Sequence, residues 1–207
     1  MELIFFILTY FLLTISILGF GFLFAKKITT YNVNISIGYA GLYGIFLLTF
    51  ISYLTNLLIK HDYLHNLILL IIGIFFFIQY VFSDQYLKKN KDFKFLIFFL
   101  FLSVLSVLYY KSHDDFPYYH LSFTHNLTLN KLEFGLGNFD LAFNHVSSLF
   151  FFHSLFRLPF TQDYFYFLGP ALIMVFANTI LIKSIYENKK KLNFHFFLKL
   201  FIFVFIN

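Results

Sequence analysis

The chain has 207 residues, of which 60% are hydrophobic, 25% aromatic and only 12% charged. A soluble domain of this composition would leave much apolar surface facing water, where it aggregates, so the composition excludes that class. The net charge of +5 resides in lysine clusters beside apolar runs, a pattern that reports membrane topology and indicates no nucleic-acid partner. The absence of cysteine excludes disulfides, a thiol nucleophile and a thiolate metal site. We therefore expect an all-α integral membrane protein whose main partner is the lipid bilayer.

Apolar blocks recur along the chain, mostly near the length of about twenty residues that an α-helix needs to cross a bilayer. They predict about five full transmembrane helices and a partial sixth, at residues 3–25, 37–59, 64–82, 95–110, 162–182 and 194–207. The second block carries Gly38, Gly41 and Gly44 at every third position, which favours close packing on a neighbouring helix. Pro170 predicts a kink in the fifth block. The sixth holds only fourteen residues, so we expect a fragment of a longer protein.

These blocks divide the chain into three regions. Residues 1–110 are predicted as a four-helix N-terminal membrane region, residues 111–161 as a large loop with an interfacial helix, and residues 162–207 as the fifth and partial sixth transmembrane helices. Ten lysines flank one set of alternating loops, against four basic residues in the opposite loops, and positive residues favour the cytoplasm. The bias predicts a bacterial inner-membrane protein with its N-terminus outside and an extracytoplasmic central loop.

The stretch from His113 to His153 is the only long segment that is not predominantly apolar, and it holds five of the eight histidines and four of the ten acidic residues. Asp114 and Asp115 directly follow a membrane span, where mutual repulsion and a lower dielectric favour protonation of one carboxylate. Such a group serves as a general base or, together with His113, as a ligand for a divalent cation. His120 follows a few residues on. The alternative is that a polar loop carries solvated charges with no chemical role.

The other polar residues have simpler interpretations. His61 and His65 lie four apart without the metalloprotease pattern, so we interpret them as two interfacial histidines rather than a metal site. Residues 145–158 predict an amphipathic helix lying flat on the outer membrane face, with a re-entrant segment as the alternative. Residues 135–138 favour a turn over a phosphate cradle, because neither a strand nor a clear helix frames them. Half-buried, hydrogen-bonded imidazoles are expected at three further positions, namely His125, His145 and His153.

An acidic pair on an outer loop, followed by interfacial helices and further spans, resembles the lipid-dependent GT-C glycosyltransferases. The segments HDDFPYYH, KLEFGLGN and SSLFFFHSLF also resemble an uncharacterised family of multi-spanning bacterial membrane proteins. The GT-C resemblance implies transfer of a sugar from a polyprenyl-phosphate donor during cell-surface glycan assembly. It implies Asp114 or Asp115 as the base or as a ligand of a divalent cation, with His120 as a third candidate catalytic residue.

A second hypothesis, from a different class, is a non-enzymatic integral membrane protein that acts in transport or assembly. Ionisable residues in the middle of a membrane span usually mark a transport pathway. The five full spans carry almost none, which disfavours the transport version of this hypothesis.

Overall fold

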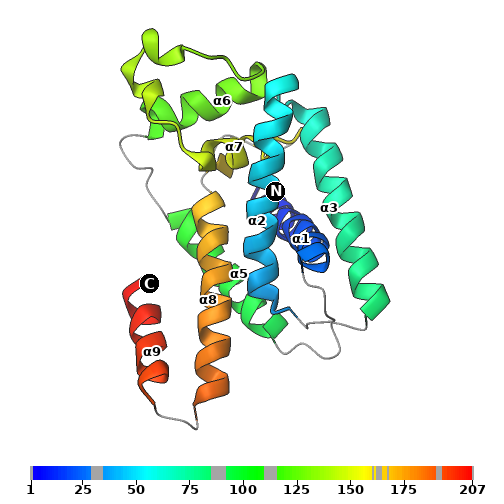
Figure 1. Ribbon diagram of the computed structural model, residues 1–207, viewed down its shortest axis with the longest axis vertical. Coiled ribbons are helices and arrows are strands. Elements are labelled where there is room, and N and C mark those ends of the chain that lie inside the picture. Colours follow the sequence, from blue (N-terminus) through cyan, green and yellow to red (C-terminus); the bar gives the residue numbers. More distant parts are fainter. Residues whose placement is uncertain are drawn as a thin grey trace.

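The computed structural model describes residues 2–28, 35–84, 92–109, 116–159, 161, 165–166, 168–189 and 193–206. Within these residues every regular element is helical. The longer helices are α1 (Glu2–Ile28), α2 (Ile37–Leu58), α3 (Tyr63–Asp84), α5 (Asp92–Tyr109), α8 (Leu168–Asn188) and α9 (Phe194–Ile206). The shorter elements are the π-helical turn η1 (Phe116–His120), α6 (Leu121–Leu129), the 3-10 turns η2 (Leu136–Asn138) and η3 (Leu141–Asn144), and α7 (Ser148–Ser154). Figure 1 shows the long helices as a bundle, with α6 and α7 gathered at one end.

Five helices of the described residues are long and apolar enough to cross a membrane, namely α1, α2, α3, α5 and α8. The predicted all-α class and five helices long and apolar enough to span are thus confirmed, while their placement in a membrane and the side on which each loop lies stay predictions. The first four spans agree with their predicted limits to within three residues. The predicted partial sixth span is the helix α9, which packs along α8.

The fifth span begins and ends six residues later than the predicted 162–182. Because α8 begins at Leu168, Pro170 lies in the first helical turn and not in mid-span. The N–H groups of a first turn have no partner within the helix, so a proline there breaks no hydrogen bond. The kink that Pro170 predicted is therefore wrong, and α8 continues through to Asn188.

Glycines set the spacing between α1 and its neighbours. A Cβ atom on Gly21 would lie 1.7 Å from a carbonyl oxygen of α2, and one on Gly44 would lie 1.9 Å from a carbonyl oxygen of α1. On Gly19 it would lie 1.8 Å from a carbonyl oxygen of α3. Backbones that approach this closely gain van der Waals contact that lipid-embedded helices depend on. Gly38 and Gly41 instead face Phe176 of α8, so the predicted glycine strip of α2 serves two neighbouring helices.

Residues 116–159, which we call the cap, cover the end of the bundle where α2 ends and α3 begins (Figure 1). Backbone hydrogen bonds fasten the cap there, from His61 N to the Leu127 carbonyl at 3.0 Å and from Leu132 N to the Asn56 carbonyl at 2.8 Å. Its helix α6 has no counterpart among the predicted elements. The cap is thus a folded layer tied to the bundle, where the sequence indicated a loop.

Helix α7 differs most from its prediction. It spans seven residues instead of the predicted 145–158, and it is covered by α6 on one side and by α2 and α8 on others. His153 and Ser154, which were assigned to a polar face, are only 8% and 0% exposed. Phe152 joins the core of the bundle, whereas Phe150 packs within the cap. The predicted length and exposed polar face are therefore wrong, because the chain folds back over Phe150–Ser154 and buries them, while the position of this segment at a membrane surface stays a prediction.

Candidate functional site

The turn η1 is the first element of the cap and directly follows the predicted catalytic residues Asp114 and Asp115 in the chain. His113, Asp114 and Asp115 lie outside the described residues, so their predicted roles stay predictions. His120 ends η1 and is partly buried, with its ring centroid 4.4 Å from that of Tyr119 and 5.0 Å from that of Phe150 in α7. The candidate His120 is therefore held by aromatic contacts and not displayed freely in solvent.

The described residues contain no group of three or more His, Cys, Asp or Glu side chains that could hold a metal ion. The candidate metal ligands, His113, Asp114 and Asp115, are not among the residues covered by that statement. Residues 135–138 form a turn, as predicted. Gly135 has a φ of 87°, which favours glycine, and its carbonyl accepts the Asn138 N–H at 2.9 Å.

A buried polar cluster, which we call the histidine network, joins α2, α3 and α7. The His61 ring is fully buried, with Nδ1 2.6 Å from Ser154 Oγ and Nε2 3.0 Å from Thr55 Oγ1. The His65 ring stacks on it with centroids 4.8 Å apart. Asn66 completes the network as a buried side chain of α3. His61 is inside the protein, and the interfacial location expected for the two histidines stays a prediction.

Asn66 gives the histidine network its connection to the cap backbone. Its Nδ2 donates to the carbonyls of Ser154 at 2.8 Å, Arg157 at 2.9 Å and His61 at 3.1 Å. These carbonyls lie at the end of α7 and at the α2–α3 junction, where no helical N–H satisfies them. One amide thus fixes α7 relative to the first turn of α3, since buried carbonyls require a hydrogen-bond donor.

Two buried rings, His61 of the network and His153 of the cap, are neutral in this environment. Burial, followed by repulsion from His65, lowers the pKa of His61 to about 3. Burial, followed by repulsion from His120, lowers the pKa of His153 to about 3. His153 Nε2 has no hydrogen-bond partner among the described residues, and Gly169 leaves just enough room for that ring. Protonation of either ring would therefore place an uncompensated charge inside the protein.

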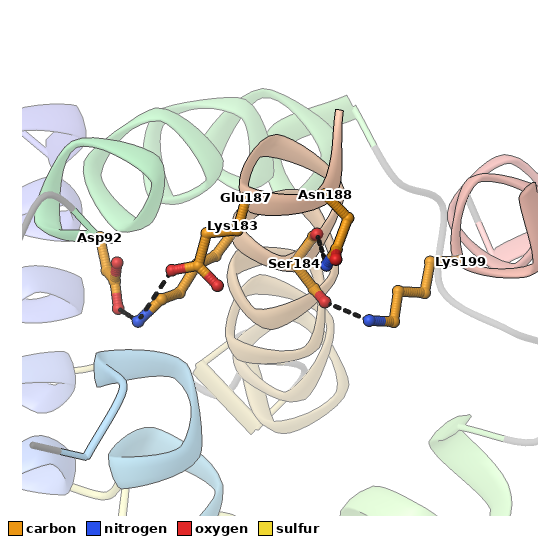
Figure 2. Close-up of polar contacts among 6 residues, drawn as sticks. All are labelled: Asp92, Lys183, Ser184, Glu187, Asn188 and Lys199. Atoms are coloured by element: carbon orange, nitrogen blue, oxygen red, sulfur yellow. Dashed lines mark hydrogen bonds and ion pairs between the residues drawn. The ribbon is translucent and has the colours of Figure 1, made fainter. Parts of the chain in front are cut away.

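The opposite end of the bundle carries charged contacts, which Figure 2 shows. Lys183 Nζ of α8 lies 2.6 Å from Asp92 Oδ2 at the start of α5 and 3.9 Å from Glu187 Oε1. Asp92 is buried, whereas Lys183 is partly exposed. Lys199 reaches across from α9 to the Ser184 hydroxyl (Figure 2). Asp92 begins α5 and Lys183 lies in the last third of α8, so the pair joins α5 to α8 near one end of the bundle and does not mark a polar path through mid-span.

Comparison with known families identifies the family of the chain. A family model described as "Domain of unknown function (DUF8201)" matches residues 1–207. The chain belongs to this family. No curated protein and no solved structure matches it. The DUF8201 match carries no likeness to GT-C glycosyltransferases, so that resemblance rests on the acidic pair and its surroundings in the sequence.

In this DUF8201 member, the sequence identified His61 and His65 as a pair on one helix face but missed their partners. Asn66 and Ser154 lie 88 residues apart in the chain, and no local pattern joins them. A usable signal was present in the polarity itself. Asn66 directly precedes a long apolar run, and a buried polar group in such a setting requires a partner elsewhere in the chain.

Proposed function

We propose that the chain is a multi-pass membrane glycosyltransferase of the GT-C kind, located in a bacterial inner membrane with its N-terminus outside. The observation that carries the proposal is the continuity of Asp114 and Asp115 with η1, whose His120 packs on the folded cap. Catalytic groups need a rigid support that fixes them to within a fraction of an ångström. The cap, tied to α2 and α3 by the histidine network, supplies such a support directly after the acidic pair.

In the proposed reaction, one carboxylate of Asp114 or Asp115 accepts the proton of an acceptor hydroxyl. The acceptor oxygen then bonds to the anomeric carbon of the donor sugar, and the bond from that carbon to the polyprenyl-phosphate oxygen breaks. Polyprenyl phosphate leaves with the bonding electron pair. The second carboxylate and His113 would hold a divalent cation against the departing phosphate. Hard divalent cations prefer oxygen ligands, which the carboxylate and the phosphate would both supply.

The test compares surface glycans in cells that carry the gene as wild type, Asp114→Asn, Asp115→Asn or His120→Ala, at matched protein level. Removal of a general base typically lowers the rate by about 10²–10⁴-fold, so at least one Asp variant should lose the glycan. Asp140→Asn, in an exposed turn of the same cap, serves as the control and should retain it. Intact glycans in both Asp variants, with a defect in the gene deletion, would remove the acidic pair from catalysis. An unaltered deletion strain would instead favour the transport or assembly alternative.

Orientation is the second arm of the test. The chain has no cysteine, so single cysteines introduced at Asn90, Asn130 and Asn188 are unique labelling sites. The ten-to-four lysine bias supports an extracytoplasmic cap, so only Asn130→Cys should react with an impermeant thiol reagent in intact cells. Labelling at Asn90→Cys without Asn130→Cys would reverse the proposed orientation.

A further inference from the structure

The cap contains a cavity to which η1 does not contribute. Its volume is about 370 Å³, at the low end of the range in which proteins hold small molecules. It lies between the end of α2, helices α6 and α7, and the turns η2 and η3. Its lining consists of an aromatic floor and a rim with polar groups, and these two parts differ in what they can bind.

The floor is built from aromatic rings held in place by each other. Tyr53 of α2 stacks on Phe151 of α7 with ring centroids 3.9 Å apart, and Phe123 of α6 meets Phe151 at 6.1 Å. Phe143 closes one side, 6.0 Å from Phe123. Because these rings belong to four different elements, the floor is rigid. Phe151 and Phe123 are buried in this stack, so the partly exposed Tyr53 and Phe143 present the apolar surface of the floor to the cavity.

The rim carries polar groups that are not used by the fold. Neither the Asn138 amide nor the Asn144 amide makes a side-chain hydrogen bond within the described residues, although both line the cavity. A Cβ on Gly137 would lie 1.8 Å from Asn144 Oδ1, so glycine is required for that amide to lie against the turn. Glu133 adds one carboxylate, and its Oε2 accepts a long hydrogen bond of 3.5 Å from Asn126 Nδ2. Two amides, each both donor and acceptor, and a carboxylate suit a ligand with several hydroxyl groups.

Charge narrows the class of ligand further. No lysine or arginine is among the described residues that line the cavity, and Glu133 is its one acidic member. A phosphate or carboxylate ligand would therefore meet repulsion and no counter-charge. A neutral or amino-bearing ligand that has one apolar face and hydroxyls on its edge fits both floor and rim. A hexose ring has that pattern, because its axial C–H groups form an apolar face.

We propose that this cavity binds a hexose residue of a glycan, with one ring face on the Phe151 side and the hydroxyls on Asn138, Asn144 and Glu133. The inference goes beyond the proposed transfer reaction, since none of the described residues 116–120 lines the cavity. A cap that performs no transfer would bind the sugar equally well.

The experiment uses the full chain in nanodiscs of phosphatidylglycerol, whose headgroup contains neither sugar nor choline. Saturation-transfer NMR and titration are performed with the methyl glycosides of glucose, galactose and mannose and with glucosamine. We expect binding of at least one of these, with saturation concentrated on one ring face. Asn138→Ala and Asn144→Ala should each weaken it about three- to tenfold, as expected for the loss of one hydrogen bond.

Two further variants make the test specific. Val146 lines the cavity and is 51% exposed, so Val146→Phe fills the space without burying new polar groups and should abolish binding. Asn130→Ala, which removes an exposed amide of the same cap outside the cavity, should leave affinity unchanged. Helix content by circular dichroism and the elution volume verify that each variant is folded.

Several results would overturn the proposal. These are no binding of any saccharide, binding that survives Val146→Phe, and binding of choline chloride in place of the saccharides. The outcome is independent of the transferase proposal, because Asp114→Asn should bind saccharide like the wild type even where it makes no glycan. Val146→Phe changes the cavity and leaves Asp114 and Asp115 intact, so a loss of saccharide binding in this variant is attributed to the cavity and not to the acidic pair.

Discussion

At the cap end of the bundle, α3 is joined to α7 by neutral hydrogen-bonding groups, whereas at the other end α5 is joined to α8 by the ion pair of Asp92 and Lys183. The cap end is the more deeply buried of the two, since His61 and Ser154 are both fully shielded from solvent. Buried polar groups are stable when each donor and acceptor is matched and carries no net charge. The ion pair of Asp92 and Lys183 tolerates charge because water still reaches the partly exposed Lys183. The two ends of the bundle should therefore lose stability under different perturbations.

The largest expected effect is a charge placed in the histidine network. Asn66→Asp keeps the size of the side chain but replaces a donor that serves three carbonyls with a carboxylate that repels them. An uncompensated buried charge typically costs about 3–5 kcal/mol, so we expect the free energy of unfolding to fall by that amount. Thermal unfolding in detergent measures it. Asn130→Asp, which makes the same change at an exposed site of the cap, is the matched control and should lie within about 0.5 kcal/mol of wild type.

Acid should perturb the cap end next most strongly. The pKa of His61 is lowered from 6.5 to about 3, so the unfolded chain binds more protons than the folded chain between these values. Stability is then fully present above pH 6.5 and is lost as the pH falls toward 3. At pH 5 the loss from His61 alone is about 2 kcal/mol, and His153 acts in the same direction.

Region-resolved hydrogen exchange, corrected for the intrinsic pH dependence of exchange, distinguishes the two ends in this experiment. Peptides from α6 and α7 should lose protection between pH 7.5 and pH 5, whereas those from the Lys183 end of α8 should change little. His61→Gln, which cannot titrate, should flatten part of the pH dependence. Equal loss of protection at both ends would contradict the assignment of acid sensitivity to the cap.

Neutralising one partner of the ion pair should have the smallest effect. Asp92→Asn leaves Lys183 without its main acceptor, and since Lys183 is partly exposed we expect a loss of about 1–2 kcal/mol. Glu187→Gln removes a more distant and exposed carboxylate and should cost less than about 0.5 kcal/mol. A double variant of Asp92→Asn with Lys183→Met should lose less than the sum of the single variants. Additive losses would show that the two side chains are not coupled.

The membrane-spanning part of the fold is well predicted from sequence, because apolar block length maps directly onto helix length. The fifth span is the exception. Its apolar block begins at residue 162, but the described helix starts at Leu168, and apolarity alone does not mark where a helix begins. Helix α6 was not predicted because LSFTHNLTL mixes residues of weak helix propensity. It forms where Phe123 and Leu127 pack on α7, a contact that local sequence does not report.

The candidate sites likewise differ in whether local sequence could predict them. The acidic pair and His120 are near one another in sequence, which is why they were predicted as a group, and with the pair outside the described residues that grouping stays a prediction. The histidine network and the cavity were not predicted, because each assembles residues from segments far apart in the chain. His61 meets Ser154 across 93 residues, and Tyr53 of the cavity floor meets Phe151 across a similar distance. Polar residues in apolar segments are the one local sign that such distant contacts exist.

The long separation within the histidine network has a consequence for biosynthesis. Helix α1 packs on both α2 and α3, and the three helices are consecutive, so their glycine-mediated contacts can form as soon as α3 is made. His61, in contrast, waits for a partner 93 residues further along. At a synthesis rate of about 5–20 residues per second, that wait is about 5–20 s. During this interval the ring and the Asn66 amide have no cap to bury them. The polar end of α1, α2 and α3 therefore lacks the Ser154 side of the histidine network until α7 has been made.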